Sequence, residues 1–222
     1  MQAWLQERGV CFLDGVIAAR DRRCLRGGEV EGREAGAEPG CCATVSWAER
    51  FGTQDEDSGG IRALAFDGRG EITLASTTTP SGGGGISTGR TDGMSLEVVH
   101  FDAGGDPRWS HLFGERAAVD VAVDAEGNSV VVGFGSSSTS WPNWTLLAAK
   151  LDADGDLQWQ LDSADEEYAW ADGVAIDAAG NVFITGTFSG DLEFGSHTLT
   201  SAGSSGQPDR ERSDIYVARL AP

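Results

Sequence analysis

The chain contains 222 residues, of which 32 are glycine and 40% are hydrophobic. This composition supplies enough apolar residues for a globular core and is too rich in glycine for a helical protein. The formal net charge of −19 would repel phosphate groups, so we expect neither a nucleic-acid partner nor attachment to an anionic membrane surface. No apolar run approaches the roughly 20 residues that a membrane-spanning helix needs, so no span is expected.

Residues 1–43 are expected to form a leader. All four cysteines lie in it: Cys11, Cys24, Cys41 and Cys42. The cysteine spacing does not indicate a zinc site, because the segment contains no Cys-x-x-Cys pair and no histidine lies nearby. An even count in a short charged segment is typical of a disulfide-stapled region of an exported protein, with a disordered segment as the alternative, and the spacing leaves the pairing open. The start does not resemble a signal peptide, because Glu7 replaces the usual basic residues and Asp14 interrupts the apolar run.

Residues 44–222 are expected to be a region of repeats. A first strand is expected at 45–52, which matches the later segment 108–114. A unit of alternating apolar residues, the turn Asp-x-x-Gly and a second alternating run then occurs three times, with aspartates 57 and 53 residues apart at Asp67, Asp124 and Asp177. A second unit of the same form interleaves with it, at positions 102 and 152. Self-similarity at this period suits a four-stranded propeller blade.

Each unit predicts an antiparallel hairpin. Alternation with period two directs one face of a strand toward a core, and aspartate favours a turn because its carboxylate binds nearby backbone N–H groups. The glycine three residues later supplies the positive φ from which the returning strand leaves the turn, so Gly127 and Gly180 are expected at positive φ. Strands are therefore expected at residues 61–66, 72–75, 96–101, 108–113, 119–123, 130–133, 146–151, 157–161, 174–176, 182–185 and 215–220.

The third repeat carries a family resemblance. The segment 174–187, followed by 214–220, resembles the bacterial SBBP repeat, a β-propeller repeat, and the similarity covers roughly residues 45–222, most of the chain. The resemblance implies a propeller on a secreted or cell-surface bacterial protein. The expected fold is therefore all-β, a partial β-propeller of about three four-stranded antiparallel blades. Propellers commonly have about four to eight blades, so we expect completion by a second copy or by further sequence.

The most acidic turn is the one candidate metal site. Asp152, Asp154 and Asp156 place three carboxylates close together, which suits a hard cation such as Ca²⁺. The same turn occurs elsewhere in the chain with Arg69 or Gly104 at the position of Asp154, and the distal glutamate of an EF-hand is missing. An ordinary hairpin turn is the favoured interpretation, so no metal and no cofactor are expected.

Aromatic residues outside the repeated strands are the candidate ligand contacts. Trp141 and Trp144 flank a proline in a loop, where two tryptophans are costly unless they are packed or bound. Trp170 lies in an acidic segment that could face a carbohydrate, with a core-covering role as the favoured alternative. His100 aligns with charged residues of the other repeats and is expected to be solvated, whereas His197 is expected in a loop.

The sequence therefore favours a noncatalytic extracellular or cell-surface scaffold that binds an unidentified protein or glycan or acts as a spacer. The alternative is a propeller enzyme that cleaves glycans with carboxylates in its rim loops; that function would need two carboxylates about 5–9.5 Å apart. No catalytic residue is assigned, because none of the three histidines has a convincing nucleophile beside it. A homodimer that closes the propeller is a further expectation.

Overall fold

The protein is all-β in the parts that the structure describes. The computed structural model describes residues 10–13, 16–20, 42–44, 47–48, 58–79, 91, 93–136, 144–163, 168–202 and 213–222. These residues form strands and turns, and no helix among them is long and apolar enough to cross a membrane. The chain divides into two compact units, residues 1–50 and 51–222.

The first unit contains a small antiparallel sheet of three strands, β1 (Val10–Leu13), β2 (Val16–Arg20) and β3 (Cys42–Thr44). Strand β2 lies in the centre and pairs with both neighbours. Cys11 and Cys42 belong to β1 and β3, whereas Cys24 and Cys41 lie outside the described residues. Of the strand expected at 45–52, the structure describes positions 47 and 48 alone, and neither is in a strand.

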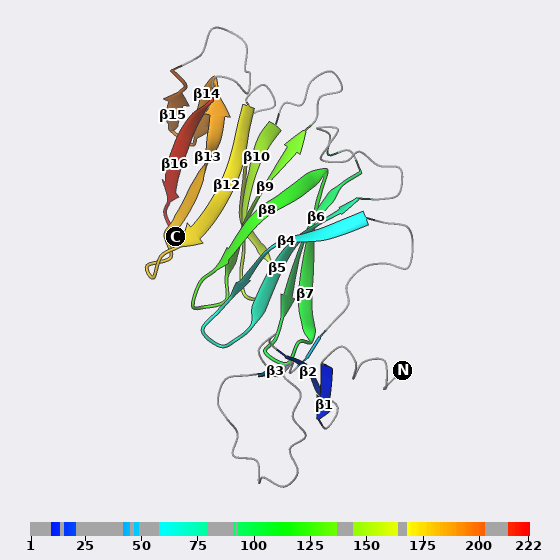
Figure 1. Cartoon of the computed structure of the whole chain (residues 1–222). Helices are drawn as coiled ribbons and strands as arrows, with labels where there is room; N and C mark the ends of the chain where they lie inside the picture. Colours follow the sequence, from blue (N-terminus) through cyan, green and yellow to red (C-terminus); the bar gives the residue numbers. More distant parts are fainter. Residues whose placement is uncertain are drawn as a thin grey trace. The chain divides into compact units, whose positions relative to one another are not determined.

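In the part of the chain that the structure describes, the second unit contains three larger antiparallel sheets, whose strands follow the chain order, and a separate two-stranded sheet (Figure 1). The first sheet consists of β4 (Ser58–Phe66), β5 (Ile72–Thr79), β6 (Ser95–Phe101) and β7 (Pro107–Gly114). The middle sheet consists of β8 (Arg116–Val123), β9 (Ser129–Ser136), β10 (Trp144–Leu151) and β11 (Leu157–Asp162). The third sheet has three strands, β12 (Tyr168–Ile176), β13 (Val182–Ser189) and β16 (Asp214–Leu220).

All the strands predicted between residues 61 and 220 are present, and their lengths differ from the predicted ones at the ends. Within the described ranges, the third sheet consists of three strands. The sequence prediction missed the hairpin β14 (Asp191–Phe194) and β15 (His197–Thr200), which is inserted between β13 and β16. The expectation that His197 lies in a loop was therefore wrong. The short hairpin forms because Leu192 is fully buried in the core beneath it.

The five Asp-x-x-Gly turns have one geometry. In each, the aspartate Oδ1 accepts hydrogen bonds from the backbone N–H groups two and four residues later, at 2.8–3.1 Å. The turn glycines all have positive φ, which confirms the prediction for Gly127 (φ 92°) and Gly180 (φ 80°). Backbone N–H groups in a tight turn cannot bond to a neighbouring strand, and the carboxylate accepts their hydrogen bonds instead. This explains why aspartate recurs at the start of each turn.

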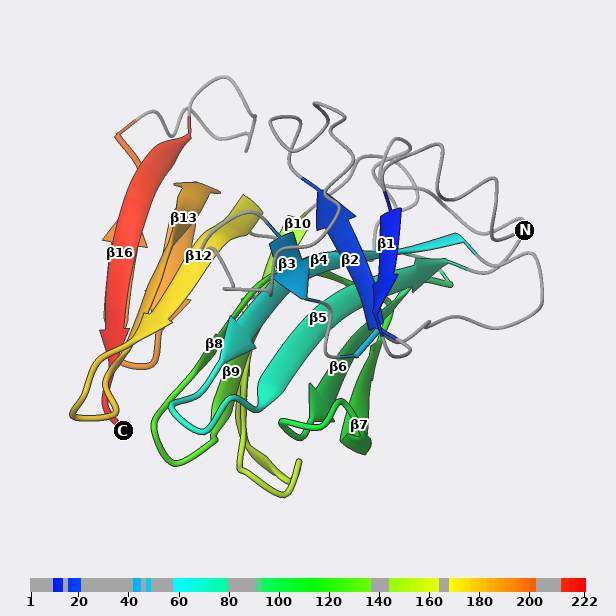
Figure 2. The same ribbon diagram turned by 60° about the horizontal axis from the view of Figure 1, so that its bottom comes forward.

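The three sheets pack on one another in chain order. The first strands of the sheets, β4, β8 and β12, are neighbours, so the sheets approach each other closely along this side (Figures 1 and 2). We call the face of a sheet that looks toward the next sheet in the chain its back face, and the opposite face its front face. Val98 on the back of the first sheet packs with Val131 on the front of the middle sheet. Val132 on the back of the middle sheet packs with Ile184 on the front of the third.

A β-bulge at the same place in each first strand bends the sheets alike, at Ile61/Ala63, Ala118/Asp120 and Ala171/Gly173. Opposite the bulge the middle sheet has Gly133, where a Cβ atom would meet the carbonyl oxygen of Ala117 and lie 2.8 Å from Leu96 Cδ1. The first sheet has Ser76 at this repeat position. A side chain at position 133 would therefore overlap both the backbone of its own sheet and Leu96 of the first sheet, whereas the first sheet accommodates a serine at this position.

Candidate functional site

The acidic turn of the middle sheet uses its central carboxylate for structure. Asp152 Oδ1 accepts hydrogen bonds from the backbone N–H groups of Asp154 and Asp156, and its Oδ2 accepts one from Gln158 Nε2 at 2.6 Å. Both oxygens of the Asp152 carboxylate thus accept hydrogen bonds from protein donors. Among the described residues, no group of three or more His, Cys, Asp or Glu side chains is arranged to hold a metal ion.

Three of the other turn aspartates are stabilised in their charged form. Burial of the Asp67 carboxyl raises its pKa, but the hydrogen bond from the Arg69 side chain and two from backbone N–H groups together bring the pKa below its usual value. The hydrogen bond from the backbone of Asp106 is the main cause of the lowered pKa of Asp102, and the one from the Asn181 side chain is the main cause for Asp177. These carboxylates stay ionised and bound to their own turns, which does not suit a proton donor.

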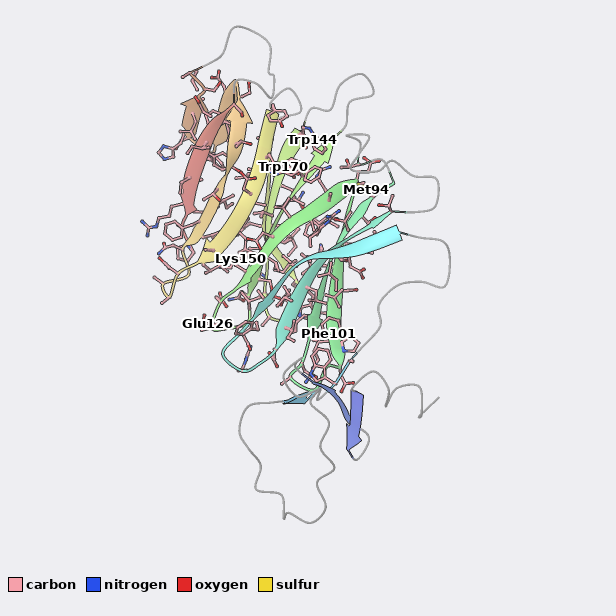
Figure 3. All side chains as sticks on the ribbon, viewed as in Figure 1. Met94, Phe101, Glu126, Trp144, Lys150 and Trp170 are labelled. Atoms are coloured by element: carbon pink, nitrogen blue, oxygen red, sulfur yellow. The ribbon has the colours of Figure 1, made fainter. Side chains whose placement is uncertain are left out.

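The tryptophans proposed as ligand contacts lie in an aromatic cluster. Trp144 is the first residue of β10 and is buried, and Trp170 on β12 is half-buried. Phe134 on β9 stacks on Trp170 with ring centroids 4.1 Å apart, and its ring meets that of Trp144 edge to face at 4.5 Å. Met94 joins the same cluster, and Figure 3 shows it with both tryptophans toward one end of the sheets.

This cluster closes one end of the contact between the middle and third sheets. The two tryptophan rings lie 5.1 Å apart in an edge-to-face arrangement, so their faces pack on protein. Trp144 therefore belongs to the core, because burial against Phe134 satisfies its apolar surface. Trp141, its proposed partner, lies outside the described residues. The partial exposure of Trp170 leaves part of one ring open to solvent, and a sugar contact there stays a prediction.

His100 occupies the most polar part of the buried interior. Its Nδ1 lies 3.0 Å from the hydroxyl of Thr73, and that hydroxyl lies 3.3 Å from the hydroxyl of Ser129 on the middle sheet. On the other side, His100 Nε2 is 3.6 Å from a carboxylate oxygen of Glu71. The imidazole also stacks on Trp109, with ring centroids 5.2 Å apart. The expectation of a solvated His100 was wrong, because this set of partners allows the ring to be buried.

A hydroxyl, an imidazole and a carboxylate in sequence are the group types of a catalytic triad. Here the hydroxyl of Thr73 lies within the contact between two sheets, where Thr73 and Ser129 are fully buried and no substrate atom can approach. The network instead links the first sheet to the middle sheet, where paired polar groups specify one packing arrangement. The sequence signal that could have found it is Thr73, a polar residue at an inward position of a strand.

The remaining histidines are separate from this network. His111 lies on β7 with its ring 4.7 Å from that of Phe113, and His197 is exposed on β15. A further link between sheets is made by Trp109, whose indole N–H donates to the carbonyl oxygen of Ala153 at 2.9 Å. Trp109 therefore joins the last strand of the first sheet to a turn of the middle sheet.

No family model matches the chain, and a comparison with curated proteins returns no significant match. The functional interpretation therefore depends on the residues themselves.

Proposed function

We propose that the chain is a noncatalytic scaffold of β-propeller repeats in which each sheet is one blade. The observation that carries the proposal is the common use of polar side chains: the carboxylates of all five repeat turns bind the backbone of their own turns. These five carboxylates therefore serve to build the repeat.

The arrangement of the sheets supports the blade interpretation. The first strands β4, β8 and β12 are adjacent, whereas the fourth strands β7 and β11 lie at the opposite edges of their sheets. Antiparallel sheets that meet along their first strands are typical of propeller blades. The extracellular or cell-surface location depends on the resemblance of residues 174–187 to the SBBP repeat, and the partner is an unidentified protein or glycan.

The proposal is tested by a glycan experiment with two readouts. The purified full chain is incubated with a panel of bacterial and plant polysaccharides, and both reducing-sugar release and retention on the immobilised glycans are measured. A scaffold releases no sugar from any of them, whether or not one glycan retains it. Sugar release that persists through a second purification step would contradict the noncatalytic function. Antibody labelling of intact and permeabilised producing cells tests the location, and labelling of the permeabilised cells alone would contradict it.

A further inference from the structure

Both outer faces of the stack expose apolar side chains, although Phe101 on the front of the first sheet is buried. On the front of the first sheet, Leu64 and Phe66 of β4 and Leu112 of β7 are exposed. On the back of the third sheet, Ile215 and Val217 of β16 are exposed. Isolated apolar residues on a surface are normal, but these gather on two particular faces, and such patches mark interaction sites.

Both faces repeat the pattern of the buried contacts inside the stack. Ile215 is 83% exposed, yet Leu146, at the same repeat position on the back of the middle sheet, is 0% exposed. Leu64 is 61% exposed, whereas Val121, its counterpart on the front of the middle sheet, is 4% exposed. The positions that are exposed on the two outer faces are therefore buried on the middle sheet, where a neighbouring sheet packs on each face.

The end sheets also do not have the features of caps. Terminal units of stacked repeats normally present a polar outer face, because an apolar one would be unpaired in water. On the second and third strands, each open face carries one charged side chain, Glu97 on the front of the first sheet and Arg219 on the back of the third. These charges are of opposite sign, so the high net negative charge of the chain is not concentrated where the two faces would meet.

We propose that the back face of the third sheet binds the front face of the first sheet in a second copy of this chain. This contact would pair a back face with a front face, as in the contacts between the first and middle sheets and between the middle and third sheets. It goes beyond the proposed scaffold function, because it identifies a surface and its partner. When both contacts form between two copies, the pair is closed by a two-fold axis.

The first test is the mass of the purified full chain in solution. Sedimentation velocity and light scattering over a wide range of concentrations are expected to show a dimer in equilibrium with the monomer. Larger head-to-tail oligomers also support the contact and indicate that two copies do not close. A monomer at all concentrations overturns the proposal.

Single lysine substitutions then locate the contact. Ile215→Lys changes the back face of the third sheet, and Leu64→Lys changes the front face of the first. Each is expected to raise the dissociation constant roughly 30-fold or more, because each places a charge in an apolar contact. Lysine reduces the net negative charge, so weaker association cannot result from added overall repulsion. Leu199→Lys on β15 is the matched control, with an exposed leucine on neither face, and is expected to leave the dimer unchanged.

Mixing the two face variants distinguishes a head-to-tail contact from a symmetric one. The Leu64→Lys chain keeps an intact third-sheet face, and the Ile215→Lys chain keeps an intact first-sheet face. Their mixture is therefore expected to form a one-to-one complex that neither forms alone. Failure of the mixture to associate, or a dimer that is insensitive to one of the two substitutions, overturns the proposal. Circular dichroism confirms that each variant is folded.

Discussion

The middle and third sheets are built from one repeat, but their back faces have different surroundings. On the middle sheet, Leu146 and Ala148 are buried against the third sheet, whereas their counterparts Ile215 and Val217 on the third sheet are exposed. The first hairpin of each sheet has the same bulge, and the next strand pairs with it in the same register. The comparison teaches that the repeat determines the shape and apolar character of a sheet, and its neighbours determine what each face contributes to stability.

The largest difference is expected for truncation of equivalent side chains. Leu146→Ala should reduce the free energy of unfolding by about 3 kcal/mol, because it leaves a cavity between two sheets. Ile215→Ala should reduce it by less than about 1 kcal/mol, since little apolar surface is withdrawn from water there. Urea unfolding at a concentration where the chain is monomeric measures both. Equal losses would mean that the back face of the third sheet is packed within one chain.

Gly133 and Ser76 provide a second contrast, on the front faces. Gly133→Ala should destabilise the fold by about 2 kcal/mol, because the added methyl group would overlap Ala117 and Leu96. Ser76→Ala at the same position of the first sheet should change stability by less than about 0.5 kcal/mol. Melting temperatures of the two variants test this, and an unaltered melt for Gly133→Ala would refute the packing explanation.

The turn that begins at Asp67 contains two glycines whose substitution by alanine should affect stability differently. Gly70 has φ 84° and ample space for a Cβ atom, so Gly70→Ala should cost about 1 kcal/mol through backbone strain alone. Gly68→Ala in the same turn meets no atom within 4 Å and requires no positive φ, so it should be neutral or stabilise the fold by up to about 1 kcal/mol. Denaturant midpoints compare the two. The reverse order of stability would contradict the turn geometry.

The smallest effect is expected from acid titration of the turns. Because the folded pKa of Asp67 is lowered, its contribution to stability is complete above its ordinary pKa of about 3.9 and is lost as the pH falls through the folded value. Asp67→Asn should therefore flatten the decline of the unfolding free energy at acidic pH. Asp154→Asn is the control, because that carboxylate accepts none of the hydrogen bonds of its turn. Equal acid dependence in both variants would contradict the assignment.

Several features of the fold could be predicted from local patterns. The Asp-x-x-Gly turns, the positive φ of their glycines and the strands around them depend on interactions within a few residues, so the sequence contains the whole cause. Alternation with period two likewise showed which residues share a face. The short hairpin β14–β15 was missed because its stability comes from the burial of Leu192 in a core that other strands complete.

The candidate site was less predictable for the same physical reason. A polar residue such as His100 reads as solvated until Thr73, Glu71 and Trp109 are brought beside it from other strands. Trp144 likewise reads as a loop tryptophan until Phe134 covers its ring. The sequence by itself determined the hairpins around the five Asp-x-x-Gly turns and the alternation of apolar residues along their strands, because these depend on local geometry. The tertiary structure alone decided which faces are buried and which are open, because burial depends on contacts between distant segments of the chain.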